Sequence, residues 1–222
     1  MKRRIVLSEY APMRADAFSS WLPDVMVCKR YEGVPLPDSF DVLVLSGGPM
    51  SAHPEDRKIH KFLEEDYNIV KSLLTSSGDT AKLFGICLGA QLITFALGGR
   101  VEEGEWVRGW QELSKKKGHN IFPDLKKFHQ FEFHKNHIRE LPDEVEVLAD
   151  SKTDAIEAFV FQNRIFGFAY HPEVTSVDAK RIYEAVNDLL LPHETHMEEF
   201  TQNFPSASLA SRTLFDYLLQ EG

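Results

Sequence analysis

The chain is poor in cysteine and has fewer basic than acidic side chains. Its 222 residues contain 2 cysteines, Cys28 and Cys87, and this number indicates no disulfide framework. Lysine and arginine together number 25 against 34 aspartate and glutamate residues, so the net charge at neutral pH is −9. Because a surface of this sign repels a phosphate backbone, we expect no nucleic-acid partner.

Long apolar runs and nucleotide-binding loops are also missing. No stretch approaches the roughly 18 consecutive apolar residues of a membrane-spanning helix. Basic residues 2–4 are followed only by the short apolar run 5–7, which is too brief for a signal peptide. No G-x-x-x-x-G-K-[ST] motif occurs, so any ATP-dependent step must come from another chain. We therefore expect a cytoplasmic protein with no cofactor and no membrane partner.

Alternating strand-like and helix-like segments run through the first half of the chain. With 43% apolar residues, the composition supports a sizeable core. Strands are expected at residues 4–7, 24–28, 41–45 and 82–84, and helices at residues 14–22, 58–74 and directly after Cys87. This alternation predicts an α/β fold with an open, mostly parallel twisted sheet that is flanked by helices. Such a sheet binds its ligand at the carboxyl ends of the strands.

The pattern changes after residue 101. Alternating segments at residues 128–133 and 145–148 predict a small antiparallel portion. Farther on, amphipathic helices are expected at residues 179–190, ended by Leu191-Pro192, and at residues 207–219.

These changes suggest a division of the chain at residue 174. We expect an α/β domain at residues 1–174 and a C-terminal helical extension at residues 175–222 that packs on the same domain. The extension could cover the active site or dock a partner. A pair of helices that cap the core is the simpler interpretation, and we prefer it.

A cysteine between two glycines stands at an expected corner between a strand and a helix. Gly85 and Gly89 lie two residues before and two residues after Cys87. At a sharp nucleophile turn, neighbours at this spacing come too close to carry side chains, and the residue at the tip has a strained backbone. The N-terminus of the following helix would favour the thiolate. The alternative is a buried structural cysteine before a tight turn.

Two further segments contain the partners that a cysteine nucleophile needs. His171 and Glu173, separated by one proline, follow a β-like stretch at residues 158–166. They can serve as a general base and as the carboxylate that orients it. The Gly47-Gly48 turn ends a short buried strand and can present a backbone N–H to an oxyanion. Taken singly, a solvated His-Glu pair and an ordinary glycine turn are the alternatives.

Together these segments resemble the class I (triad) glutamine amidotransferase family. The resemblance is carried by the motifs Ser46-Gly47-Gly48-Pro49, Gly85-Ile86-Cys87-Leu88-Gly89-Ala90-Gln91 and His171-Pro172-Glu173-Val174. The run Gly-Gly-Pro-Met-Ser is similar to that of the freestanding, GMP synthase-like domains of the family. The chain departs from the family pattern at Asn136, where aspartate is common. The resemblance implies a flavodoxin-like sheet.

The resemblance also implies a reaction and the residues that perform it. Cys87 would attack the side-chain amide of glutamine, His171 would transfer the proton, and Glu173 would orient His171. Ammonia would leave, and water would release glutamate from a γ-glutamyl thioester. The implied oxyanion hole consists of the backbone N–H groups of Gly48 and Leu88. The implied substrate-binding residues are Gly47, Gln91, Phe133 and His134.

Three functions remain open on the sequence. The first, which we expect, is a glutaminase that releases ammonia for a separate acceptor or for a synthetase subunit in trans. The second is a γ-glutamyl peptide hydrolase with the same triad, because only the leaving amine would differ. The third is a non-catalytic regulatory module, which the complete triad disfavours.

The remaining histidines do not indicate a metal site. His129, His134 and His137 form one group, and His193 and His196 form another. Neither group has a standard zinc spacing such as H-E-x-x-H. We therefore expect no bound metal.

Overall fold

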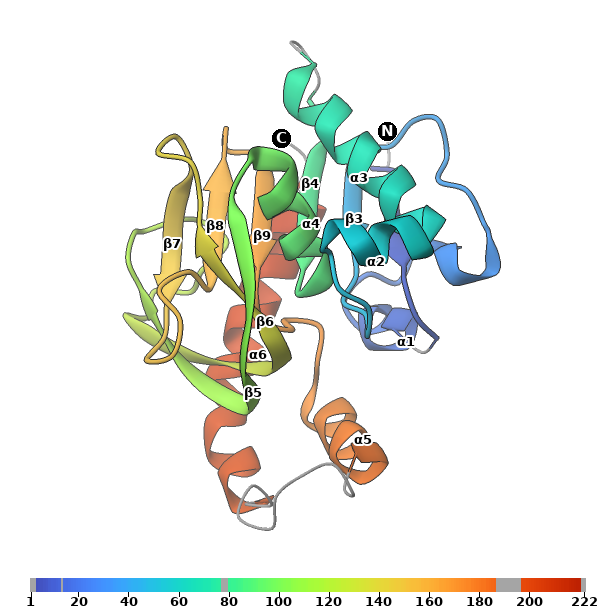
Figure 1. Ribbon diagram of the computed structural model, residues 1–222. Helices are drawn as coiled ribbons and strands as arrows, with labels where there is room; N and C mark the ends of the chain where they lie inside the picture. The colour runs from blue at the N-terminus through green and yellow to red at the C-terminus, as the bar shows by residue number, and fades with distance from the viewer. Residues whose placement is uncertain (1–2, 13, 77–79, 187–196, 221–222) are drawn as a thin grey trace.

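One mixed sheet with helices on both faces organises the protein (Figure 1). The computed structural model describes residues 3–12, 14–76, 80–186 and 197–220. In this part of the chain, 9 strands lie in the order β2-β1-β3-β4-β9-β8-β7-β5-β6. They are β1 (Ile5–Glu9), β2 (Met26–Lys29), β3 (Val42–Leu45), β4 (Lys82–Ile86), β5 (Arg100–Lys115), β6 (Lys127–Glu140), β7 (Glu146–Asp150), β8 (Ala158–Phe161) and β9 (Ile165–Phe168).

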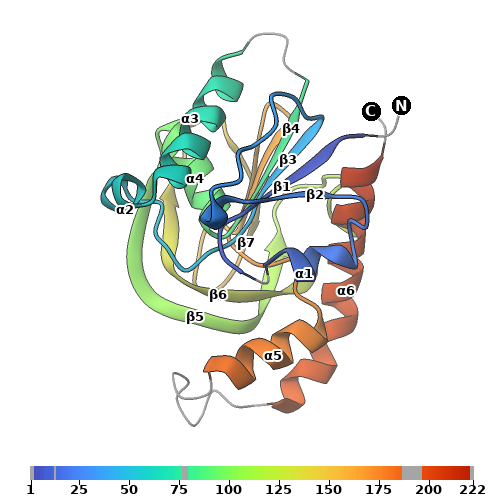
Figure 2. The same cartoon turned by 90° about the vertical axis from the view of Figure 1, so that its right-hand side faces the viewer.

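The sheet has a parallel half and an antiparallel half. Strands β2, β1, β3, β4 and β9 pair in parallel, whereas β9, β8, β7, β5 and β6 pair antiparallel. The α/β fold expected from the sequence is therefore confirmed. Its antiparallel portion is larger than expected, mainly because β5 and β6 form a long curved hairpin that sweeps under the sheet (Figure 2).

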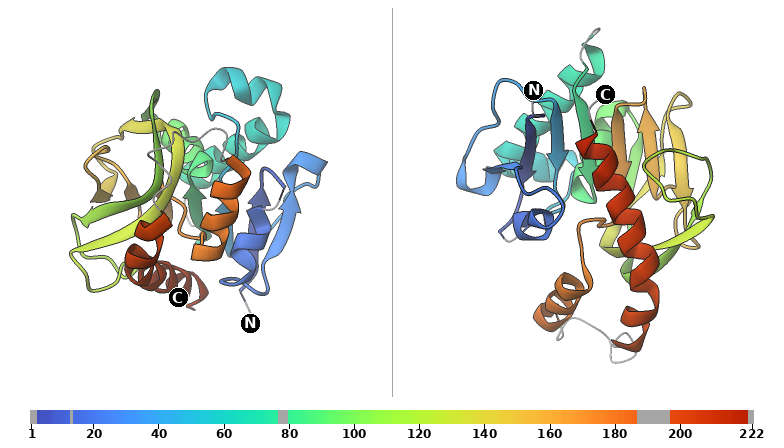
Figure 3. Two further views of the ribbon diagram at one scale, coloured as in Figure 1. Left: turned by 90° about the horizontal axis from the view of Figure 1, so that it is seen from below. Right: turned by 180° about the vertical axis from the view of Figure 1, so that it is seen from behind.

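Helices cover both faces of the parallel half. Figure 2 shows α2, α3 and α4 on one face and α1 and α6 on the other, and the rear view in Figure 3 shows α6 crossing the back of the sheet. The helices are α1 (Arg14–Ser19), the 3-10 turn η1 (Arg30–Glu32), α2 (Pro54–Ile59), α3 (Lys61–Thr75), α4 (Leu88–Leu97), α5 (Ser176–Val186) and α6 (Met197–Leu219). No helix in the described ranges is both long enough and apolar enough to span a bilayer.

The core has two layers because the central strands are buried on both faces. Along β3, Val42 and Val44 point toward α1 and α6, whereas Leu43 and Leu45 point toward α3 and α4. Successive side chains of a strand point to opposite faces, so a strand with two covered faces is a continuous apolar run. This is why the run Val-Leu-Val-Leu forms a central strand.

The strand register brings three chain segments to one edge of the sheet. Leu45 of β3 pairs with Gly85 of β4, and Ile86 of β4 pairs with Phe168 of β9. The carboxyl ends of β3, β4 and β9 are therefore neighbours. The glycine turn, the cysteine corner and the His-Pro-Glu segment each follow one of these ends.

Two glycines allow the corner between β4 and α4 to pack against β3. A Cβ atom on Gly89 would lie 2.4 Å from the Leu45 carbonyl oxygen, and one on Gly85 would lie 2.6 Å from the Gly89 carbonyl oxygen. Both distances are shorter than the 3.0 Å that Cβ atoms in proteins keep from other heavy atoms. The opposing atoms belong to the backbone, so they cannot move aside as a flexible side chain could. The spacing argument from the sequence is therefore correct at both positions.

Two boundaries expected from the sequence are wrong. The helix expected at residues 58–74 is divided at His60, whose ψ of 85° is not helical, into α2 and α3. The apolar spacing continues across this break and so does not reveal it. The β-like stretch 158–166 is a hairpin, because Gln162 and Asn163 both have φ of 53° and reverse the chain between β8 and β9.

The C-terminal helices are integrated into the fold. Helix α6 begins at Met197, earlier than the expected residues 207–219, and contains Pro205. Its residues Leu214 and Phe215 belong to the same core layer as the strands, and the Phe215 ring stacks on that of Trp21 with centroids 5.2 Å apart. Residues 187–196 lie outside the described ranges, and with them the expected helix end at Leu191-Pro192 and both His193 and His196.

Substitution of Gly89 by alanine should destabilise the protein. The new Cβ atom must displace the β3 backbone, so we expect Gly89→Ala to lower the free energy of unfolding by about 1–3 kcal/mol in urea titrations. Gly118→Ala is the matched control, because a Cβ atom there meets nothing within 4 Å. Equal stability of the two variants would contradict the close approach of α4 to β3.

Candidate active site

Cys87 occupies the tip of the corner between β4 and α4. Its φ of 50° and ψ of −103° lie in a region that side chains rarely adopt. Its backbone N–H donates to the Phe168 carbonyl at 2.7 Å, and its carbonyl accepts from the Gln91 N–H at 3.0 Å. These bonds hold the strained residue in place at the N-terminus of α4, where the helix dipole favours a thiolate.

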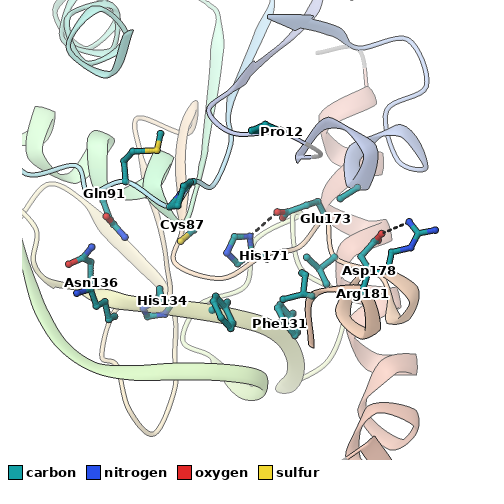
Figure 4. A pocket seen from close by; sticks show the side chains of 18 of the residues that line it. Pro12, Cys87, Gln91, Phe131, His134, Asn136, His171, Glu173, Asp178 and Arg181 are labelled. Atoms are coloured by element: carbon teal, nitrogen blue, oxygen red, sulfur yellow. Dashed lines mark hydrogen bonds and ion pairs between the residues drawn. The ribbon is translucent and has the colours of Figure 1, made fainter. Parts of the chain in front are cut away.

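His171 approaches Cys87 from the segment after β9. Its backbone N–H donates to the Phe131 carbonyl at 2.7 Å, and its Nδ1 lies 2.8 Å from Glu173 Oε1. The imidazole also hydrogen-bonds to Cys87, and Figure 4 shows the ring between the sulfur and the carboxylate. Trp21 fixes the end of this segment, because its Nε1 donates to the Glu173 carbonyl at 3.0 Å.

The charge of the His171 ring is set by its two neighbours. Burial alone would lower the pKa of His171, but Glu173 and the Cys87 sulfur together raise it from 6.5 to about 10. Because the folded-state pKa is the higher one, the stabilisation is complete below the unfolded pKa and is lost as the pH rises through about 10. At neutral pH the imidazolium is therefore the stable form, as in an activated cysteine nucleophile.

A cavity of about 420 Å³ opens over the Cys87 sulfur (Figure 4). Among its lining residues, Gln91, His134 and Asn136 lie on one side of Cys87, and Phe131, Asp178 and Arg181 lie beyond His171 on the other. We call these two regions the Gln91 arm and the Arg181 arm. The sulfur lies between them.

The residues singled out in the sequence gather around this cavity. Gly48, Gln91, Phe133 and His134 line it together with Cys87, His171 and Glu173. Gly47 lies against the His171 ring, because a Cβ atom there would be 2.6 Å from Cε1. Leu88 is the first residue of α4, and its side chain contacts Gly48.

Gln91 presents an unpaired acceptor to the cavity. Its side chain is buried, and Oε1 has no hydrogen-bond partner among the residues that the structure describes. A buried acceptor without a partner is costly unless a ligand supplies the donor. The ammonium group of an amino acid is such a donor.

Sequence reasoning missed two buried carboxyl groups that lie close to His134, one of the residues that line the cavity. Glu132 and Glu157 are both 0% exposed, and Glu132 Oε2 lies 3.1 Å from Nε2 of His134. A partial signal was present for Glu157, since it stands directly before the apolar strand β8, but Glu132 lies in a strand that also contains other polar residues. Ligating atoms of Glu132, His134 and Glu157 lie within 4.8 Å of one another, and within the described part of the chain this is the group of residues that could hold a metal. The absence of a metal stays a prediction.

Comparison with known proteins assigns the family. The sequence model of the family described as Glutamine amidotransferase class-I matches residues 28–185 of this chain. The chain belongs to this family. The matched range contains the cysteine corner and the His-Pro-Glu segment, so the resemblance stated from the motifs is confirmed.

Curated relatives and a solved structure agree with this assignment. The glutamine-hydrolyzing GMP synthase subunit of Picrophilus torridus is 33% identical over 144 residues, which are 62% of this chain and 70% of that protein. The protein of the same name from Pyrococcus abyssi is 31% identical over 165 residues, 73% of this chain and 72% of that protein. The crystal structure of a glutamine amidotransferase from Thermotoga maritima covers 100% of both chains, with 21% identity and a TM-score of 0.84, and so shows the same fold.

Alkylation should distinguish the two cysteines. We expect iodoacetamide to modify Cys87 faster than Cys28 at neutral pH, because the imidazolium of His171 favours the Cys87 thiolate, whereas burial raises the pKa of Cys28. Peptide mass mapping over time measures both rates. His171→Ala should slow the Cys87 reaction roughly tenfold, and His60→Ala is its control. An unchanged rate in His171→Ala would mean that the imidazole does not activate the sulfur.

Proposed function

We propose that this class I glutamine amidotransferase hydrolyses the side-chain amide of glutamine through a Cys87-His171-Glu173 triad. The observation that carries the proposal is the position of the His171 ring, which hydrogen-bonds to Cys87 on one side and to Glu173 at 2.8 Å on the other. All three side chains line the same cavity. Glutamine-hydrolysing activity is also in the printed names of the relatives.

In the proposed mechanism, the sulfur of Cys87 attacks the amide carbon of glutamine. His171 gives its proton to the leaving nitrogen, the C–N bond breaks, and ammonia departs. A γ-glutamyl thioester remains on Cys87. His171 then takes a proton from water, the resulting hydroxide attacks the thioester carbonyl, and glutamate leaves as the thiolate re-forms. Glu173 keeps the ring oriented and stabilises its charged form.

The proposed oxyanion hole lies between the glycine turn and α4. The backbone N–H of Leu88 is in the first turn of α4, where helix amides have no partner within the helix. The N–H of Gly48 comes from the turn after β3. Because Gly48 has no side chain, its backbone packs closely against the Leu88 side chain. Two such donors would stabilise the negative oxygen of the tetrahedral intermediate more than the carbonyl of the substrate.

The Gln91 arm is the proposed site for the amino acid portion of glutamine. Gln91 Oε1 would accept a hydrogen bond from the substrate ammonium group. His134 lies in this arm and Phe133 lines the same cavity, and both would contact the substrate backbone atoms. Gly47 would contribute by allowing the His171 ring to approach, because any side chain there would collide with it.

The ammonia is proposed to serve a separate synthetase. Both relatives are named as one subunit of a GMP synthase, and this is the basis for a partner that acts in trans. We also propose to treat residues 1–174 as the amidotransferase unit and 175–222 as a helical extension of the same domain, since α6 packs on β5 and β6.

Release of glutamate from glutamine tests this proposal. We expect Cys87→Ser to reduce kcat by roughly four orders of magnitude or more, because a triad loses its function with its nucleophile. The matched control is Cys28→Ala, which lies outside the cavity and should keep its activity. Turnover by Cys87→Ser near that of the parent chain would refute the mechanism. A chain that is silent alone should be assayed with candidate synthetase subunits before it is judged inactive.

A second candidate function, hydrolysis of γ-glutamyl conjugates, is favoured by the Arg181 arm. Cavities of about 300–1,000 Å³ typically hold drug-sized ligands, and 420 Å³ falls in this range. With a glutamyl group in the Gln91 arm, a leaving amine larger than ammonia would extend past His171 toward Asp178 and Arg181. The Arg181 side chain is 67% exposed and could bind a carboxylate on that amine.

Substitution of Arg181 tests the second candidate. We expect Arg181→Gln to lower kcat/KM for γ-glutamylglycine by roughly fivefold, because an exposed ion pair contributes on the order of 1 kcal/mol. Glutamine and γ-glutamyl methylamide lack the second carboxylate and should be unaffected. Lys180→Gln, one residue away on α5, controls for the charge change. Equal losses for all three substrates would remove the reason for this candidate.

A further inference from the structure

The Arg181 arm of the cavity has an apolar side. Four apolar residues that pack in one cluster between β6 and α5 line the cavity: Phe131, Phe133, Val174 and Ile182. Figure 4 shows Phe131 and Arg181 beyond His171, on the side away from Gln91. The arm therefore combines an apolar surface with a cation.

Trp106 of β5 extends this surface toward solvent. Its side chain lines the cavity and is 46% exposed, and its ring centroid lies 5.4 Å from that of Phe133. The Arg108 guanidinium lies over the same ring, 4.8 Å from the centroid. A half-exposed aromatic ring in a cavity offers a surface that a ligand can cover. We call Trp106 and the four residues of the cluster the apolar wall.

The backbone of β5 holds Trp106 in its position. The pairing of β5 with β6 shifts register between Glu103 and Val107, so a bulge carries Trp106. The Glu105 carbonyl oxygen in this bulge lies 2.9 Å from Nε2 of His137 on β6. Bulges beside active sites commonly re-aim a side chain. The fold therefore presents the ring of Trp106 to the cavity.

Hydrolysis of glutamine leaves the apolar wall without a role, because ammonia has no apolar surface. A larger leaving amine would start at His171 and lie along the wall. An aromatic ring on this amine would gain the free energy of burying apolar area, and would pack against other rings. Asp178 lies 3.9 Å from Arg181 and offsets part of its charge, so we expect the wall to give most of the preference.

We propose that the apolar wall is the subsite for the leaving amine, and that the chain hydrolyses γ-glutamyl amino acids with an aromatic side chain. This inference rests on the second candidate function. The Cys87 sulfur bonds to the γ-carbonyl carbon, the C–N bond breaks, and His171 gives its proton to the leaving nitrogen. The aromatic amino acid departs in place of ammonia, and water then releases glutamate from the thioester.

Turnover of two γ-glutamyl dipeptides tests this subsite. We expect kcat/KM for γ-glutamylphenylalanine to exceed that for γ-glutamylglycine by roughly tenfold, because the phenyl ring buries apolar surface against the wall. Both leaving amino acids carry the same carboxylate, so Arg181 cannot account for the difference. Equal values, or a preference for γ-glutamylglycine, would overturn the proposal.

Substitutions in the apolar wall locate the preference. Trp106→Ala and Ile182→Ala should each reduce the ratio of the two kcat/KM values toward one. Ile182→Ala decides the question if Trp106→Ala does not fold. Ile59→Ala is the control and should keep the parent ratio, because this side chain is 72% exposed on α2 and outside the cavity. A parent ratio in both wall variants would refute the role of the wall.

Calorimetry on Cys87→Ser separates the subsite from the proposed reaction. We expect γ-glutamylphenylalanine to bind about tenfold more tightly than γ-glutamylglycine, and Trp106→Ala in the same background to remove the difference. If this difference is present but neither glutamine nor a dipeptide is hydrolysed by the parent chain, the proposed function fails and the subsite stands. If the dipeptides are hydrolysed but bind without preference, the function stands and this inference is overturned. Failure of both dipeptides to bind would also overturn it.

Discussion

The close packing of three strand ends is the constraint on which the rest of the site depends. Strands β3, β4 and β9 are adjacent and parallel, so whatever follows them must share one small space. Gly89 meets the Leu45 carbonyl, and Gly47 meets the His171 ring, with no room for a Cβ atom at either place. These contacts force Cys87 into its positive-φ conformation and place the imidazole against its sulfur. The arrangement of the three proposed triad residues is therefore a consequence of sheet topology and side-chain volume together.

Much of this site could be predicted from the sequence because its motifs report local geometry. Glycines two residues either side of Cys87 indicate the sharp corner, and the His-Pro-Glu spacing puts Glu173 within reach of His171. The alternation of strands and helices then brings these motifs to the same edge of the sheet. Each step depends on residues close in the chain or on a general rule of parallel sheets.

The features that sequence reasoning missed depend on contacts between distant segments. Glu132 on β6 and Glu157 just before β8 come within 4.8 Å of each other, and Trp21 donates a hydrogen bond to the Glu173 carbonyl from a distant segment. No local pattern predicts which buried glutamates will meet. The break at His60 was missed for a different reason, since the apolar spacing of one helix continues in the next.

Buried charge links the site to the stability of the fold. On the cavity side, His171 is cationic because Glu173 and Cys87 surround it. Beside His134, burial and the neighbouring carboxylates raise the pKa of both Glu132 and Glu157.

Trapping of the acyl intermediate tests the central claim most directly. The chain would be mixed with glutamine or a γ-glutamyl substrate, quenched in acid within its first turnovers, and digested for mass spectrometry. The account predicts one glutamyl group on the peptide that contains Cys87 and none on the peptide that contains Cys28. Release of glutamate without any such adduct, in a chain whose turnover also survives Cys87→Ser, would contradict it.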